Sequence, residues 1–340
     1  MADTVQQLLL ANADRDDVGV RFGDRCWTWR EYVAESLARA AVITGGFDSD
    51  RPPHVGVLLE NTPEMAMALA AGALGGYVTV GLNATRRGEA LARDVRKADC
   101  QFVLTDSRHL PLLDGLSLDG VRVIDTDAAE WSRLVADAPR DREFRTVDSM
   151  DTFMLIFTSG TSGEPKAVRV SNFMVTMSGT HLVERFSLTD DDVCYVSMPL
   201  FHSNAVVAGF GPAVASGATL ALARRFSATG FLDDVRRYGA TYMNYVGKPL
   251  AYVLATPEKP DDADNPLRIA FGNEASDRDI VEFGRRFGCE VYDCGSDRPK
   301  TPIIISRTEG TPPSSIGQPW VGCGRLRPGD PHRVPAGGVR

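Results

Sequence analysis

The residue types between Thr158 and Lys166 are those of a phosphate-binding loop. The apolar run Phe153 to Phe157 has the length and composition of a strand, and it leads into six small, mostly hydroxyl-bearing or glycine residues. Small residues allow backbone N–H groups to converge on an anion, hydroxyl groups add donors, and a lysine supplies the positive charge. This combination predicts a loop that cradles phosphate groups.

The loop is not of the Walker A type. A Walker A loop requires Gly-x4-Gly-Lys followed by Ser or Thr, whereas here Gly160 and Gly163 are three residues apart and Ala167 follows Lys166. The simpler alternative is a polar turn between two strands, since apolar and polar residues alternate after the lysine as in a second strand. A plain hairpin turn does not need so many hydrogen-bond donors, so phosphate binding is favoured.

The stretch Thr158 to Ala167 resembles the phosphate-loop signature Thr-Ser-Gly-Thr-Thr-Gly-x-Pro-Lys-Gly of the adenylate-forming acyl-CoA synthetases. Ser162 and Ala167 are its two departures. The resemblance covers nearly all of the chain, and it implies fatty-acid–CoA ligation. In that reaction ATP and a carboxylate give an acyl-adenylate and pyrophosphate, and CoA then displaces AMP. The resemblance therefore implies ATP and CoA as co-substrates and Mg²⁺ as the metal.

The resemblance also implies roles for individual residues. Thr161 and Lys166 would be catalytic, with Thr161 assisting the metal, and His202 would border the acyl site as a third catalytic residue. The alternatives are a structural or solvated histidine and a simple strand-to-helix turn at residues 272–274. The implied nucleotide contacts are Thr158, Ser159, Gly160, Thr161, Ser162, Gly163, Lys166, Gly272, Asn273, Glu274, Asp293, Gly295 and Ser296.

One motif departs from the family in a way that bears on activity. The family has Asp-x-aromatic-Gly-Ser-Thr-Glu, and its glutamate helps to hold magnesium, but Arg298 stands at that position here. Two like unit charges about 4 Å apart repel by roughly 4 kcal/mol at an effective dielectric constant of about 20. No counterpart of the ribose-binding Thr-Gly-Asp motif or of the lid-domain lysine follows before Arg340. We therefore expect a truncated and catalytically impaired chain.

The surrounding elements predict an α/β fold made of two doubly wound α/β subdomains. Val55 to Leu59 is a continuous apolar run, typical of a parallel strand that is covered on both faces. Thr62 and Pro63 then begin a helix as its cap and its first turn. Strands and helices continue to alternate along the chain. The predicted subdomains are residues 1–148 and 149–321, followed by an irregular tail at 322–340 that we expect to be mobile.

The composition excludes several classes of protein. The 340 residues are 43% hydrophobic and 24% charged, as in globular proteins, and the net charge of −8 argues against a nucleic-acid partner. Six scattered cysteines without a Cys-x-x-Cys pair predict reduced thiols in a cytoplasmic protein. The N-terminus has no signal-peptide pattern. Glycines interrupt the long uncharged stretch Met65 to Leu82, which predicts a buried helix and strand and no transmembrane segment.

Three functions are compatible with the sequence. The first is a fatty-acid–CoA ligase, whose acyl pocket would be lined by Val206, Val207, Tyr242 and Tyr245 and would take a fatty acid or another hydrophobic carboxylate. The second is a fatty-acyl-AMP ligase that transfers its adenylate to an acyl carrier protein. The third is a degenerate, non-enzymatic lobe that binds nucleotide weakly or not at all. The departures described above favour the third function for the polypeptide as given.

The C-terminal residues predict changes of reading frame. The family pattern is close up to Ser296 and is expected to end after Val321, and 12 of the 19 residues from Gly322 to Arg340 are Gly, Pro or Arg. Arginine outnumbers lysine 32 to 5, which indicates GC-rich codons, and such DNA read out of frame encodes mostly Gly, Arg, Pro and Ala. We expect frame changes near Ser296 and Gly322; a natural loop-rich terminus is the alternative.

Overall fold

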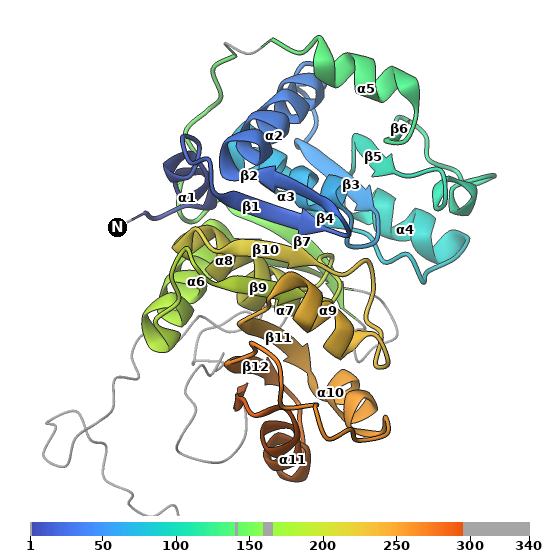
Figure 1. The fold of residues 1–340 in the computed structure, drawn as a ribbon. Coiled ribbons are helices and arrows are strands. Elements are labelled where there is room, and N and C mark those ends of the chain that lie inside the picture. Colours follow the sequence, from blue (N-terminus) through green and yellow to red (C-terminus); the bar gives the residue numbers. More distant parts are fainter. Residues whose placement is uncertain (1, 140–141, 159–165, 295–340) are drawn as a thin grey trace, which may run out of the picture.

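The structure is a computed structural model that describes residues 2–139, 142–158 and 166–294. In these ranges the strands form a seven-stranded sheet and a six-stranded sheet, with helices between and outside them (Figure 1). Only β2 and β8 of the described strands run antiparallel to their neighbours. The predicted α/β class with two doubly wound sheets is therefore confirmed.

In each sheet the strands lie side by side in an order that differs from their order in the sequence. The seven-stranded sheet contains β13 (Glu290–Cys294), β12 (Ile269–Asn273), β11 (Tyr242–Val246), β9 (Val193–Val196), β10 (Thr219–Leu222), β1 (Val18–Phe22) and β2 (Arg25–Thr28). The six-stranded sheet contains β6 (Arg122–Asp125), β5 (Phe102–Thr105), β3 (His54–Leu58), β4 (Val78–Gly81), β7 (Thr152–Thr158) and β8 (Lys166–Ser171).

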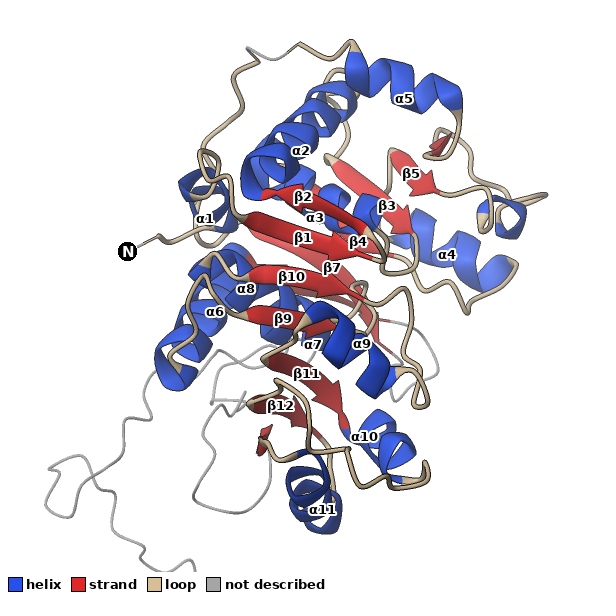
Figure 2. Ribbon diagram, in the orientation of Figure 1, coloured by secondary structure: helices blue, strands red, loops and turns tan. Residues whose placement is uncertain are grey.

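The helices connect and cover these strands, as Figure 2 shows. They are α1 (Val5–Ala11), α2 (Trp29–Thr44), α3 (Pro63–Gly75), α4 (Glu89–Lys97), α5 (Ala129–Ala136), α6 (Asn172–Phe186), α7 (Ser203–Ala205), α8 (Gly211–Ser216), α9 (Phe231–Tyr238), α10 (Gly247–Leu254) and α11 (Asp277–Phe287), with a 3-10 turn η1 (Leu110–Leu112) and a π-helix η2 (Val206–Phe210). The predicted start of α3 at Thr62 and Pro63 is confirmed. The Thr62 hydroxyl accepts the Met65 N–H at 3.2 Å, and Pro63 occupies the first turn of α3.

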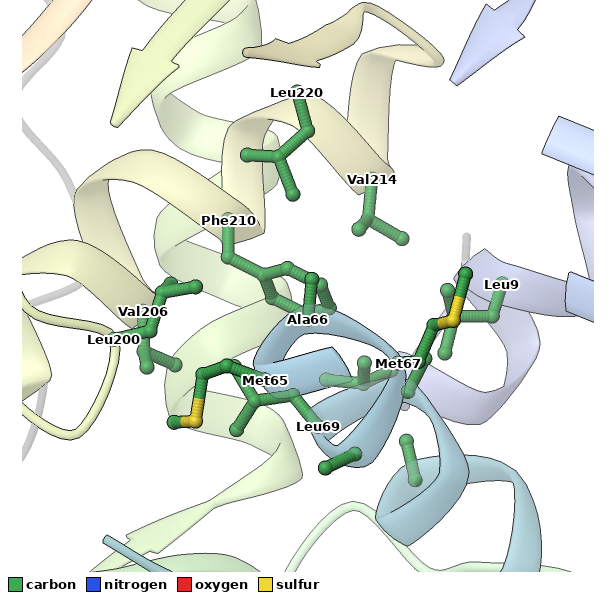
Figure 3. Close-up of a cluster of buried hydrophobic side chains, with 14 of the residues drawn as sticks. Leu9, Met65, Ala66, Met67, Leu69, Leu200, Val206, Phe210, Val214 and Leu220 are labelled. Atoms are coloured by element: carbon green, nitrogen blue, oxygen red, sulfur yellow. The ribbon is translucent and has the colours of Figure 1, made fainter. Parts of the chain in front are cut away.

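Three apolar cores give the molecule five layers. The largest core lies between the sheets and joins α3 of the first half of the chain to η2, α8 and β10 of the second. Figure 3 shows this contact, in which Met65 and Ala66 of α3 lie beside Val206 and Phe210. A second core lies between the seven-stranded sheet and the outer helices α9, α10 and α11. A third lies between the six-stranded sheet and α4.

The two sheets do not divide at the predicted boundary between residues 148 and 149. The hairpin β1–β2 joins the seven-stranded sheet through β10, and the pair β7–β8 joins the six-stranded sheet through β4. Each sheet therefore takes one strand pair from the other half of the chain. The reason is that a strand pairs with whichever sheet edge fits its register, and neighbours in sequence carry no signal for that choice. Independent folding of residues 1–148 or 149–321 stays a prediction.

The uncharged stretch Met65 to Leu82 is a buried helix followed by a buried strand, as predicted. Every residue of α3 from Met65 to Gly75 is buried, and β4 lies inside the six-stranded sheet. No helix in the described part of the chain is both long and apolar enough to cross a membrane. The described cysteines Cys26, Cys100, Cys194 and Cys289 are free thiols.

Candidate active site

The carboxyl ends of parallel strands from both sheets meet in one region. In the seven-stranded sheet, β10 lies on one side of β9 and β11 on the other, so the strand order reverses at β9. In the six-stranded sheet, β4 and β5 lie on opposite sides of β3 in the same way. Ligands of doubly wound sheets bind outside the carboxyl ends of the strands where the order reverses in this way. Residues 197–202, the His202 loop, follow β9 and reach β4, because the Phe201 backbone lies directly against Gly81.

Lys166 lies at the end of β7 from which the predicted phosphate loop departs. It is the first residue of β8 and pairs with Thr158, the last residue of β7. Lys166 is half-buried, and no acidic side chain of the described residues forms an ion pair with it. Because β4 pairs with β7, Lys166 and the His202 loop lie at the same end of the six-stranded sheet, where β4 and β7 terminate. The predicted contacts Ser159, Gly160, Thr161, Ser162 and Gly163, and the side chain of Thr158, lie outside the described residues, so their roles stay predictions.

His202 is the residue immediately before α7. Its N–H donates to the Pro199 carbonyl at 3.0 Å, and its carbonyl accepts the Val206 N–H at 3.3 Å. The imidazole lies beside the Phe201 ring, with 4.5 Å between the ring centroids. Burial lowers the pKa of the His202 imidazole below its usual value. A neutral imidazole in an apolar loop is suited to border a hydrophobic substrate.

The low pKa of His202 predicts a pH dependence of stability. In the unfolded chain the imidazole regains its ordinary pKa of about 6.5, so as the pH falls the unfolded state binds the proton first. The protonation of His202 therefore favours unfolding at acidic pH. We expect the free energy of unfolding of the wild type, measured in urea relative to a His202→Gln variant, to fall between about pH 7.5 and about pH 5.5. An equal difference at both pH values would contradict the assignment.

Asp293, near the end of β13, ties the end of β11 to the loop that follows β12. Its buried carboxylate accepts the Tyr245 hydroxyl at 3.0 Å and the Ala275 N–H at 2.9 Å. Gly272 is required by close packing, because a Cβ there would overlap the Tyr245 carbonyl and lie 2.6 Å from its ring. Asp293 thus fixes the segment that carries the predicted nucleotide contacts Gly272, Asn273 and Glu274.

Asn273 and Glu274, the two residues that follow Gly272, lie at and just beyond the end of β12. Glu274 is exposed and has a left-handed φ of 66°. Asn273 is half-buried and accepts a hydrogen bond from the Asn204 side chain at 2.8 Å. Direct contact of Gly272, Asn273, Glu274 or Asp293 with a nucleotide stays a prediction. Gly295, Ser296 and Arg298 lie outside the described residues, so their roles are also untested.

The four residues predicted to line an acyl pocket do not line one surface. Tyr242 and Tyr245 are three positions apart on β11 and therefore point to opposite faces of the sheet. Tyr242 and Val206 are fully buried in the core between the sheets, whereas Tyr245 is buried under the outer helices. Val207 is only half-buried. The prediction of a pocket with both tyrosines in its wall is therefore wrong, and the alternation along β11 was sufficient to exclude it.

Two asparagines that were not among the predicted site residues join the segments of the candidate site by hydrogen bonds. Asn61 follows β3 and bonds the His202 loop, and Asn204 in α7 bonds the ends of β11 and β12. Their position one to three residues beyond a buried strand and a predicted site residue was the available signal. Neither partner could be identified from the sequence, since they lie 40 or more positions away.

The described residues contain no group of three His, Cys, Asp or Glu side chains that could hold a metal ion. Thr161, the predicted metal contact, lies outside them. A cavity of about 660 Å³ opens between the β1–β2 hairpin, α2, α3 and α5, and no predicted site residue lines it. In the lining of this cavity, the Glu64 carboxylate accepts two hydrogen bonds from Arg39 and one from Trp131.

Comparison with known families agrees with this geometry. The family described as AMP-binding enzyme matches residues 10–337. The chain belongs to the AMP-binding enzyme family. The match extends beyond Val321, so the expectation that the resemblance ends there is wrong, and a frame change near Gly322 loses that support. The recognition made from the phosphate loop and the later motifs is confirmed.

Relatives within the AMP-binding family include CoA ligases. The chain is 55% identical over 316 residues to the medium/long-chain-fatty-acid–CoA ligase FadD17 of Mycobacterium tuberculosis, which covers 92% of this chain and 62% of that protein. It is 43% identical over 322 residues to the steroid-22-oyl-CoA synthetase of Rhodococcus jostii, which covers 93% of this chain and 57% of that protein. The chain thus spans less than two thirds of the length of either relative.

A solved structure confirms the fold of the family. The anthranilate CoA ligase AuaEII, crystallised in complex with anthranoyl-AMP, superposes with a TM-score of 0.78 at 19% sequence identity. The superposition covers 94% of this chain and 65% of that one. At this level of identity the likeness establishes the fold alone.

Proposed function

We propose that this chain is the nucleotide- and acyl-binding lobe of a fatty-acid–CoA ligase. The observation that carries the proposal is the 55% identity with FadD17 across 92% of this chain. The geometry supports it, because Lys166, the His202 loop and the loop that Asp293 holds after β12 all lie beyond the carboxyl ends of parallel strands. Doubly wound folds bind nucleotides there. Lys166 is half-buried at the start of β8 and forms no ion pair with an acidic side chain among residues 2–139, 142–158 and 166–294, which further favours a phosphate ligand.

The reaction would proceed in two displacements. The carboxylate of the fatty acid attacks the α-phosphorus of ATP, the bond to pyrophosphate breaks, and an acyl-adenylate forms. The thiolate of CoA then attacks the acyl carbon, and AMP leaves. Lys166 would offset the charge on the phosphates during the first step, and the neutral imidazole of His202 would border the acyl carboxylate. The Gly272–Glu274 segment would flank the adenine.

The co-substrates and the metal follow from this proposal. ATP and CoA would be bound as substrates, and the partner would be a fatty acid or a related hydrophobic carboxylate. Mg²⁺ would accompany ATP, held mainly by the nucleotide phosphates, with Thr161 as the predicted protein contact. The free thiols support a reducing, cytoplasmic location. An acyl carrier protein as acceptor in place of CoA, and a lobe without catalysis, are the competing outcomes of the test below.

The proposal predicts ATP–pyrophosphate exchange that depends on a long acyl chain. We expect octanoate, palmitate or oleate to stimulate the exchange about tenfold or more over acetate, because each buried methylene contributes about 0.8 kcal/mol. A thioester formed with free CoA would distinguish a CoA ligase from a carrier-protein ligase. ATP binding without any acid-dependent exchange would identify the non-catalytic lobe that Arg298 and the missing downstream motifs favour, and would overturn the catalytic part of the proposal.

A further inference from the structure

The His202 loop is bound by the side-chain amide of a residue from the other sheet. Asn61 donates from Nδ2 to the Met198 carbonyl at 2.8 Å, and its Oδ1 accepts the Leu200 N–H at 2.8 Å. Its own N–H donates to the Arg224 carbonyl at 3.2 Å. Asn61 is only 2% exposed, so these bonds are shielded from water. The loop therefore receives from Asn61 the pair of bonds that a neighbouring strand would provide.

A second asparagine anchors the chain just after His202. Asn204 donates from Nδ2 to the Tyr245 carbonyl at 3.0 Å and to Asn273 Oδ1 at 2.8 Å. Its Oδ1 accepts a bond from the fully buried Asn244 at 2.7 Å. The segment that carries His202 is thus bonded to the six-stranded sheet on one side and to β11 and β12 of the seven-stranded sheet on the other.

Apolar contacts add to these anchors. The side chain of Leu200 is fully buried and lies in the core between the sheets with Met65 and Val206 (Figure 3). Phe201 lies against Gly81, where a Cβ would come within 2.7 Å of the Phe201 carbonyl oxygen. No regular strand or helix contains residues 197–202, so the loop depends on these contacts for its shape.

We propose that Asn61 is a positioning residue of the active site, which sets the place of His202 by holding Met198 and Leu200 against the six-stranded sheet. Asn61 itself touches no substrate in this proposal. The catalytic consequence rests on the proposed function, whereas the structural consequence does not. The inference links the two sheets, since a shift of β3 relative to β9 would move His202 through Asn61.

The side-chain chemistry explains why asparagine is required. The amide is the group that donates and accepts at once within this reach, whereas an ionised aspartate accepts only. Alanine would leave the buried Met198 carbonyl and the Leu200 N–H without partners. Leaving a buried backbone group unpaired costs more than the net value of the lost hydrogen bond.

The test compares Asn61→Ala with a matched control, Asn265→Ala. The half-buried Asn265 side chain also bonds backbone groups of a loop: it donates to the Asp262 and Phe287 carbonyls and accepts from the Leu267 N–H. It lies near the opposite end of β12 from the His202 loop. Hydrogen–deuterium exchange of the peptide that covers residues 197–203 is the first measurement. We expect about tenfold faster exchange there in Asn61→Ala and no change there in Asn265→Ala.

The second measurement reports on His202 directly. We expect the imidazole Cε1–H resonance of His202 to shift in Asn61→Ala and to stay unchanged in Asn265→Ala. In acid-dependent pyrophosphate exchange, Asn61→Ala should lower kcat by about tenfold or more while the KM for ATP stays within about twofold. Asn61→Ser, which keeps one hydroxyl donor and acceptor, should lie between the wild type and Asn61→Ala in all three measurements.

Clear outcomes overturn the inference. Unchanged exchange at residues 197–203 together with an unchanged His202 resonance in Asn61→Ala would exclude a positioning role. An Asn265→Ala variant that loosens the His202 loop equally would show a general loss of stability. If Asn61→Ala does not fold, hydrogen exchange of the Leu200 N–H in the wild type tests the inference. This N–H lies outside every strand and helix, so its protection would support the bond to Asn61, and rapid exchange would overturn the inference. Absence of acid-dependent exchange in the wild type would defeat the proposed function alone.

Discussion

Replacing Lys166 with alanine is expected to raise the dissociation constant for ATP about ten- to a hundredfold. A hydrogen bond to a charged group contributes about 1.5–3 kcal/mol, which corresponds to this range at room temperature. Lys166 lies opposite Thr158 at the end of β7, where the predicted phosphate loop begins, and forms no ion pair with an acidic side chain in the described part of the chain. Isothermal titration calorimetry with ATP measures the effect.

The control for this variant is Arg169→Ala on the same strand. Arg169 is exposed, and its Nε donates to the Thr152 hydroxyl at 2.7 Å, near the opposite end of the β7–β8 pair. We expect the Arg169→Ala variant to bind ATP within about twofold of the wild type, since exposed charges far from a ligand contribute little. Equal affinities of wild type and Lys166→Ala would remove Lys166 from the nucleotide site.

Replacing Gly247 with alanine is expected to cost about 3 kcal/mol or more of unfolding free energy, at the upper end of the range for overpacked positions. Gly247 is the first residue of α10, and a Cβ there would overlap the Glu274 carbonyl and lie 2.7 Å from the Ala275 nitrogen. These backbone atoms cannot move aside easily, because Asp293 holds the Ala275 N–H and Glu274 already has a left-handed φ of 66°. The loops after β11 and β12 would have to separate.

Urea unfolding of Gly247→Ala and of a control, Gly230→Ala, tests this packing. Gly230 precedes α9 with an ordinary φ of −91°, and a Cβ there would come no closer than 3.2 Å to the Ser227 side chain. We expect the Gly230→Ala variant to stay within about 1 kcal/mol of the wild type. Unfolding of both variants at the same urea concentration would show that the loops at Gly247 and Glu274 are not in close contact.

The sequence by itself determined the local structure and the family. The apolar run before Asn61, the Thr62 cap and Pro63 predicted β3 and the start of α3, and the structure contains both. Ser171 caps α6 by an equally local contact, because its hydroxyl accepts the Met174 N–H at 3.2 Å. These features depend on residues within a few positions of one another, so a single segment contains all the information. The phosphate-loop signature around Lys166 was likewise local, and it was sufficient to identify the AMP-binding family.

The tertiary structure alone decided which sheet each strand joins and which residues hold the candidate site. Lys166 and His202 were predicted from the sequence to be site residues, but only the pairing of β4 with β7 and the contact of Phe201 with Gly81 place them at the same end of the six-stranded sheet. The bonds of Asn61 to the His202 loop span about 140 positions. The physical reason is that such contacts arise when sheets and helices bury their apolar faces together, and an asparagine after a strand has the same local pattern whether or not a partner will reach it.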